Sequence, residues 1–158
     1  MTHLLTRLAA CALLALPAAS LADDLPAGHI SVGDHHDFGP SGIMVRSNRA
    51  ELLPLTLSAG QPVAETEYDL RSGGYYRISI EADGTQELAL SGGDFFRAIW
   101  INEVVINDIE IRPMGVHSIE FDAAGEARIS FIAIVPGRYE LAIPGARGET
   151  QRAVFNIR

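Results

Sequence analysis

Three histidines and two aspartates lie close together near the N-terminus. Asp34 and Asp37 flank the pair His35 and His36, and His29 precedes them. Imidazole and carboxylate groups together suit divalent copper, zinc or nickel. Adjacent residues of a regular strand point to opposite faces, so both imidazoles can bind one ion only from an irregular segment. This cluster predicts a metal site with His29, His35, His36 and Asp37 among its ligands. The alternative is a solvated histidine pair without a physiological ion, because a site with few preorganised ligands loses affinity to chain ordering.

A second fragment with possible metal ligands follows later in the chain, from Pro113 to His117. Met114 offers a thioether, a soft donor that suits cuprous ion, and His117 lies three residues after it on a predicted loop. Together with the N-terminal histidines, Met114 and His117 predict copper, as Cu(I) or Cu(II), as the ion. The alternative for Met44 and Met114 is packing in the core or in a loop.

The remaining polar residues predict no catalytic chemistry. The sequence contains neither a nucleophile-elbow motif, a zinc-protease motif, a phosphate-binding loop nor a dinucleotide fingerprint. His117 and Ser118 are neighbours, so on a strand they face opposite ways and cannot form a catalytic pair. An oxygen-rich group around the apolar Trp100 segment lacks the spacing of a calcium-binding loop and is expected to be a solvated strand face: Asn102, Glu103, Asn107, Asp108 and Glu110. We therefore expect a protein that is not an enzyme.

The N-terminus has the pattern of a secretory signal peptide. An apolar run from Leu8 to Leu16 is too short to span a bilayer, and small residues at Ser20 and Ala22 indicate cleavage after Ala22. The alternative is a lipoprotein, with lipid attached at Cys11. Residues 1–22 are thus the expected signal peptide, and the predicted location is the periplasm, with no membrane span in the mature chain.

Charge and cysteine content exclude several classes of function. The 158 residues carry 12 basic and 20 acidic side chains, and loss of Arg7 with the signal peptide leaves 11 arginines against 20 acids, a net charge of −9. An acidic surface repels nucleic acid and anionic lipid, so neither is an expected partner. Cys11 is the single cysteine and lies in the signal peptide. The mature chain therefore has no disulfide, thiolate metal site or cysteine nucleophile.

The rest of the sequence has the rhythm of an all-β domain. Residues 23–42 are polar and rich in Gly and Pro, which predicts a flexible N-terminal arm, and residues 43–158 form the predicted domain. Short apolar runs recur there about every ten positions with turn residues between them. These runs predict an antiparallel two-sheet sandwich. The expected strands are 43–46, 52–57, 63–70, 75–81, 87–90, 109–111, 118–121, 129–133, 139–143 and 153–157.

Two local patterns in this domain need separate interpretation. The dipeptide Asp83-Gly84 favours a β-hairpin, because both central residues of a tight hairpin turn prefer positive φ. The segment from Phe95 to Ile106 has an ambiguous period, and its β-branched and aromatic residues favour a strand over a helix.

Part of the chain resembles the cupredoxin family. The segment Phe131 to Leu141, with Pro136-Gly137-Arg138-Tyr139, is similar to the last two strands of cupredoxins, and Leu55 to Val63 is similar to an early strand and turn of such domains. The resemblance implies a cupredoxin-like sandwich, and an immunoglobulin-like sandwich is the alternative. Cupredoxins carry Cys, His and Met copper ligands after this tyrosine, whereas residues 141–152 contain none of the three, so the resemblance does not imply a blue-copper site.

Two functions follow as expectations. The first is a periplasmic metal-binding protein that binds or delivers copper at a site without blue-copper character. The second is a non-catalytic interaction module, an accessory subunit of a periplasmic enzyme or transport system. It would bind a partner protein through the surface of Phe95, Phe96 and Trp100 or through an exposed sheet edge. The sequence leaves the oligomeric state open.

Overall fold

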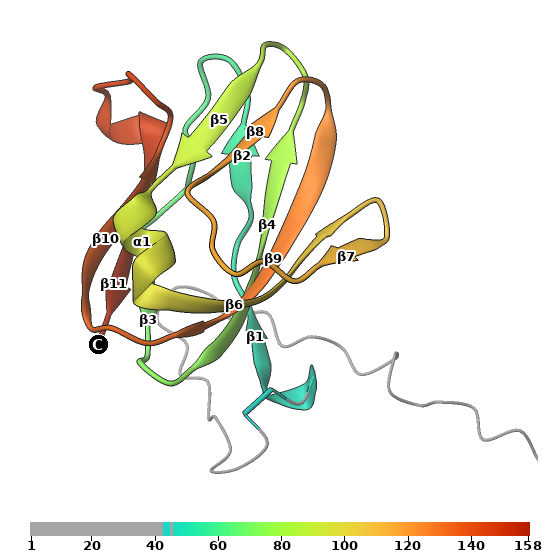
Figure 1. Cartoon of the computed structure of the whole chain (residues 1–158). Helices are drawn as coiled ribbons and strands as arrows, with labels where there is room; N and C mark the ends of the chain where they lie inside the picture. Colours follow the sequence, from blue (N-terminus) through green and yellow to red (C-terminus); the bar gives the residue numbers. More distant parts are fainter. Residues whose placement is uncertain (1–42, 45) are drawn as a thin grey trace, which may run out of the picture.

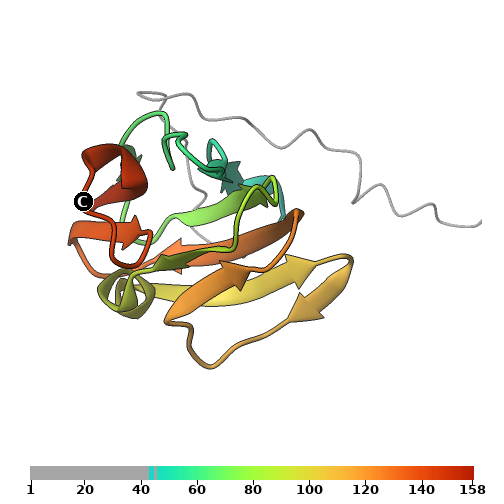
Figure 2. The ribbon, with the colours of Figure 1, turned by 90° about the horizontal axis from the view of Figure 1, so that it is seen from above.

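The computed structural model describes residues 43, 44 and 46–158, which form a sandwich of two facing β-sheets (Figures 1 and 2). The all-β, two-sheet architecture expected from the sequence is confirmed. The predicted signal peptide, residues 1–22, and the predicted arm, residues 23–42, lie outside the described residues.

The first sheet, sheet A, contains six of the described strands. Five follow the order β1-β4-β9-β6-β7, and β2 pairs with β4 beyond the end of β1. Their bounds are β1 (Arg49–Glu51), β2 (Leu55–Leu57), β4 (Tyr75–Ala82), β6 (Ile99–Ile106), β7 (Ile109–Ile111) and β9 (Gly125–Ala133).

The second sheet, sheet B, contains five of the described strands in the order β3-β11-β10-β5-β8. Their bounds are β3 (Tyr68–Leu70), β5 (Leu88–Ser91), β8 (Ser118–Phe121), β10 (Gly137–Ala142) and β11 (Arg152–Ile157). Three short helical segments complete the described chain: η1 (Arg46–Asn48), α1 (Gly93–Ala98) and η2 (Glu149–Gln151).

Both sheets are mixed, whereas the sequence predicted antiparallel pairing. The strands β1 and β2 run parallel to β4, and β3 runs parallel to β11. Parallel neighbours require a crossover connection instead of a tight turn. The early strands supply these crossovers, because the chain passes between the two sheets as it goes from β2 to β3 and on to β4.

The core between the sheets is built around three phenylalanines. Phe131 on β9 and Phe155 on β11 come from opposite sheets, and both are fully buried. Phe95 on α1 lies between them, with ring centroids 4.2 Å from Phe155 and 5.8 Å from Phe131. The short helix α1 therefore contributes a side chain that joins the two layers, and its place beside β10 is visible in Figure 1.

The segment Phe95 to Ile106 forms both elements that its ambiguous period suggested. A helix, α1, ends at Ala98 and is followed at once by the strand β6. The helical part follows Gly92 and Gly93, and it turns Phe95 and Phe96 inward, where both are buried. The expectation that these two phenylalanines line a docking surface is therefore wrong. Trp100, on the outer face of β6, is 46% exposed.

The Asp83-Gly84 dipeptide makes a turn, but the prediction of a hairpin there is wrong. Gly84 has φ +73°, as a tight turn requires. The flanking strands nevertheless lie in different sheets, because β4 pairs with β9, β1 and β2, whereas β5 pairs with β8 and β10. The strand expected at residues 43–46 is also not formed: Ile43 and Met44 lie in a turn and η1 begins at Arg46.

None of the described residues belongs to a helix long and apolar enough to cross a bilayer.

Candidate metal centre

The structure tests only part of the predicted metal site. His29, His35, His36 and Asp37 lie outside the described residues. Met114 and His117 are described, and both belong to the connection between β7 and β8, residues 112–117. The sequence therefore placed these two donors on a loop correctly.

The β7–β8 connection presents both donors to solvent. Met114 is fully exposed, and His117 is exposed. The alternative of core packing for the methionines is wrong for Met114. Met44 lies in a turn, is 40% exposed and lines a groove with Arg49 and Tyr75, so it is outside the core and its position agrees with packing in a loop.

The C-terminal end of this connection is fixed against the start of α1. The carbonyl oxygen of His117 accepts a hydrogen bond from the backbone N–H of Gly92 at 3.2 Å. The imidazole lies over Gly93, where a Cβ atom would come within 3.2 Å of the ring carbon Cδ2. Gly93 thus leaves room for the ring. A larger residue at Gly93 would displace the imidazole.

Within the described part of the chain, His117 belongs to no group of three or more His, Cys, Asp or Glu side chains close enough to hold one ion. An imidazole and a thioether three residues apart can supply at most two ligands from this loop. Transition-metal sites with their full protein shell use three or four. The loop can therefore hold an ion only together with donors from elsewhere, and the rest of the shell would stay open to solvent or to another donor.

Three carboxylates that the sequence reasoning did not group lie near one another at the far end of sheet B. Oxygen atoms of Glu87, Glu120 and Asp122 are all within 4.8 Å of one another, and all three residues are exposed. The antiparallel pairing of β5 with β8 brings them together, since Leu88 faces Phe121 in the register. Only the strand pairing could have revealed this cluster, because Glu87 is more than thirty residues from the other two. Exposed carboxylates of this kind suit a hard cation rather than copper.

Three of the oxygen-rich residues around Trp100, namely Asn102, Glu103 and Glu110, contact Arg112. The guanidinium of Arg112 donates to the side-chain oxygen of Asn102 at 3.0 Å and to Glu110 at 3.1 Å, and it lies 3.3 Å from Glu103. The Glu103 carboxylate also accepts from the Ser130 hydroxyl at 3.3 Å. These contacts agree with the expectation that the group is a polar strand face.

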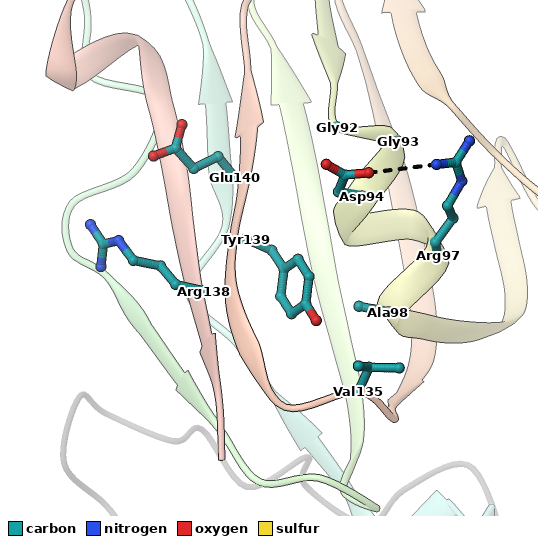
Figure 3. Close-up of a pocket in the computed structure, with 9 residues that line it drawn as sticks. All are labelled: Gly92, Gly93, Asp94, Arg97, Ala98, Val135, Arg138, Tyr139 and Glu140. Carbon is teal, nitrogen blue, oxygen red and sulfur yellow. Dashed lines mark ion pairs between the residues drawn. The ribbon is translucent and has the colours of Figure 1, made fainter.

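A groove beside Gly92 and Gly93, which contact His117, has no set of metal ligands in its lining. It has a volume of about 570 Å³ and lies between α1 and β10, with Gly92, Gly93, Ala98 and Val135 in its wall (Figure 3). The Tyr139 ring turns toward α1, and its hydroxyl donates to the Pro136 carbonyl at 3.3 Å. Its charged rim contains the pair Asp94 and Arg97, 3.6 Å apart, together with Arg138 and Glu140. Such a lining lacks the imidazole, thioether or clustered carboxylates that bind an ion.

A strong electrostatic perturbation lies beside sheet B, at Glu67, away from the candidate ligands. Arg138 donates to both carboxylate oxygens of Glu67, at 2.7 and 2.9 Å, and Asn156 donates to one of them at 3.0 Å. These hydrogen bonds lower the pKa of Glu67 to about 2. The carboxylate therefore stays charged at every pH near neutrality.

Comparison with known structures gives only partial and distant likenesses. Parts of several copper enzymes have structures similar to that of this chain. A copper nitrite reductase from Nitrosomonas europaea shares 18% identity with a TM-score of 0.46, over 60% of this chain and 33% of that one. A laccase-like multicopper oxidase from Ochrobactrum sp. shares 9% identity with a TM-score of 0.48, over 79% of this chain and 33% of that one. Another multicopper oxidase shares 6% identity with a TM-score of 0.48, over 68% and 44%.

These likenesses are partial, because the chain spans between 20% and 44% of the length of these and two other copper enzymes. Neither a family model nor a curated protein sequence matches the chain. At such low identity no ligand set or activity is carried over from the enzymes. Functional arguments for this protein must therefore come from its own residues.

Proposed function

We propose that this protein binds copper and passes it on, at an open site without blue-copper character. The observation that supports the proposal is the solvent-exposed connection between β7 and β8, which presents the Met114 thioether and the His117 imidazole three residues apart. The copper loop of cupredoxins needs a thiolate, and residues 141–152 of this chain offer neither Cys, His nor Met. Copper would therefore be bound at the β7–β8 connection instead.

The chemistry of the two donors favours copper over other ions. A thioether is a soft ligand that suits Cu(I), and imidazole binds both Cu(I) and Cu(II). Zinc and nickel gain little from a thioether, so Met114 is the side chain that would separate copper from them.

An incomplete and exposed ligand set suits transfer better than storage. A stored ion needs a complete, preorganised shell, whereas an ion held by two exposed side chains is accessible to ligands of an acceptor. His29, His35 and His36 are the donors that we propose to complete the shell before transfer. A signal peptide over residues 1–22, with delivery to the periplasm, is part of the same proposal.

Metal titration of the purified chain tests this function. We expect calorimetry and competition with a chromophoric Cu(I) chelator to show binding of about one copper ion at micromolar or lower concentration. Met114→Leu should weaken Cu(I) binding by about tenfold or more, because it removes the soft donor, and should leave Zn(II) binding unchanged. The pair of changes His35→Ala and His36→Ala should weaken Cu(II) binding.

Met44→Leu is the matched control, since Met44 is also an exposed methionine but lies in a different groove. Equal loss of Cu(I) affinity in both methionine variants would contradict a role for Met114. The proposal fails if the protein does not bind copper at micromolar levels.

A second candidate function, an accessory subunit that binds a partner protein, is favoured by the exposure of Trp100. This indole is 46% exposed on β6, a strand inside the sheet between β9 and β7, and large aromatic side chains are usually more covered than this. This candidate predicts a defined partner whose binding is lost in Trp100→Ser, together with no tight metal binding.

A further inference from the structure

The edge strand β7 leaves sheet A without a neighbour on one side. Among the described strands, β7 pairs only with β6, and the two form a hairpin that projects from the sandwich (Figures 1 and 2). All three residues of β7 are exposed, Ile109 by 64% and Ile111 by 44%. An exposed apolar edge is a template for pairing with another strand, and natural proteins usually protect it.

The hairpin turn determines which backbone groups of β7 face outward. Asn107 and Asp108 have φ of 49° and 64°, the signature of a two-residue type I′ turn. In such a hairpin Ile106 and Ile109 form a hydrogen-bonded pair, and bonding alternates along the strands. Ile109 and Ile111 thus bond to β6. The N–H and C=O groups of Glu110 and Arg112 point to the free side.

We propose that β7 pairs with β7 of a second copy of this chain, antiparallel about a two-fold axis at Ile111. In this register Glu110 of each copy lies opposite Arg112 of the other, and these are the residues whose backbone groups face outward. Both hydrogen-bonded pairs therefore carry opposite charges, and each pair exchanges two backbone hydrogen bonds. This proposal does not depend on copper binding.

Alternative registers are less favourable. Centring the axis on Glu110 places the two Glu110 carboxylates opposite each other, which is destabilising. A shift by one residue places a residue whose backbone groups face outward opposite a residue whose backbone groups are already bonded to β6. The hydrogen bonds between the two copies then cannot form. The charge pattern of the edge therefore disfavours the axis at Glu110. Arg112 contacts Glu110 and Glu103 of its own chain, so in the proposed register its guanidinium is shared with Glu110 of the other copy.

The same arrangement covers apolar surface. Ile109 lies opposite Pro113 of the other copy, and the exposed Met114 follows directly. Ile106 is also exposed at the hairpin, where it lines a groove of about 230 Å³ with Ile119 and Phe121 of β8. A second copy would remove part of this surface from water, which supports association by the hydrophobic effect.

Cysteine cross-linking tests the register. Ile111 opposes itself across the axis in a non-hydrogen-bonded pair, where Cα atoms lie about 4.5 Å apart, within disulfide range. Ile111→Cys should therefore give a disulfide-linked dimer under mild oxidation. Ile109→Cys is the matched control. Ile109 is more exposed than Ile111, but in the proposed register the two Ile109 residues of the dimer are separated by four positions along the paired strands. The single native cysteine, Cys11, is changed to Ser in both.

Measurement of molar mass tests the edge itself. Sedimentation or light scattering of the full chain should show a dimer that dissociates on dilution. Glu110→Pro removes two outward N–H donors per dimer and leaves the bonds to β6 intact, so it should raise the dissociation constant about tenfold or more. Glu110→Ala keeps the N–H groups and should have a smaller effect.

Two results would overturn the proposal. The first is a monomer at every concentration up to the millimolar range. The second is cross-linking of Ile109→Cys as fast as Ile111→Cys, which would indicate random collision instead of a defined register. Metal titration decides the copper proposal separately, so the two can fail independently.

Discussion

Two edge strands of the sandwich, β3 and β7, have almost the same sequence pattern and opposite environments. Each has three residues, with an acidic residue between two apolar ones: Tyr68-Asp69-Leu70 in β3 and Ile109-Glu110-Ile111 in β7. In β3 both apolar side chains are buried, by 95% or more. Both isoleucines of β7 are exposed.

The difference comes from what covers each strand. Tyr68 stacks on Phe155 with ring centroids 4.9 Å apart, and its hydroxyl donates to the Leu53 carbonyl at 3.1 Å. Asp69 accepts from Arg158 at 3.0 Å, so the polar face of β3 is also occupied. Among the described strands, β7 is paired with its hairpin partner β6 alone. An alternating pattern thus specifies which residues share a face, but not whether anything covers that face.

The largest difference in stability between variants of β3 and variants of β7 is expected when their apolar side chains are truncated. Tyr68→Ala should lower the free energy of unfolding by about 3–5 kcal/mol, because it leaves a cavity beside Phe155 and removes a buried hydrogen bond. Ile111→Ala should lower it by less than about 1 kcal/mol, since the side chain is 44% exposed. Urea denaturation measures both. Equal losses would show that Ile111 is covered in solution, either by another part of the chain or by a second copy.

The pH dependence of stability should also follow the β3 side of the molecule. The pKa of Glu67, next to β3, is lowered to about 2 by its hydrogen bonds with Arg138 and Asn156. A carboxylate with a lowered folded-state pKa contributes stability above its unfolded pKa, 4.5, and that contribution is lost as the pH falls toward 2.

Thermal melts between pH 6 and pH 2 test this linkage. We expect Glu67→Gln to be less stable than the natural chain at pH 6 and to lose less stability on acidification. Because the carboxylate is exposed, the difference should shrink in high salt. A Glu67→Gln profile that matches that of the natural chain would contradict the role of the Arg138 pair.

Elements whose evidence is local in the sequence could be predicted well. The alternation from Tyr75 to Glu81 predicted β4 almost to its ends, and residues 118–121 are β8 as expected. Both strands show clear period-2 patterns between turn residues. The fold class followed from repetition of such runs.

Pairing partners could not be predicted, because they depend on contacts distant in the sequence. Asp83-Gly84 has hairpin chemistry, yet the next strand joins the other sheet. Asn107-Asp108 makes the hairpin instead, with positive φ at two residues that are not glycine. Phe95 and Phe96 are as apolar as an interface residue would be, and only the three-dimensional core shows that they are buried.

Candidate ligands were predicted as residue types and not as a site. Sequence placed Met114 and His117 on a loop, which the structure confirms by their exposure. The acidic trio with Glu87 depends on the register between β5 and β8 and has no sequence signature. Copper as the ion remains a prediction from the donor chemistry.

The smallest expected effect concerns the turn that holds β7 in place. Asp108 has φ 64°, a conformation that glycine adopts without strain, so Asp108→Gly should raise the free energy of unfolding by about 0.5 kcal/mol. The same substitution at Asp69 should lower it by about 1 kcal/mol, because glycine weakens an extended strand and the ion pair with Arg158 is lost. Opposite signs in urea denaturation would show that β7 depends on its turn and β3 on its packing. If both changes destabilise the protein, the stabilisation that the Asp108 side chain gives to the hairpin is larger than the strain energy of its positive φ.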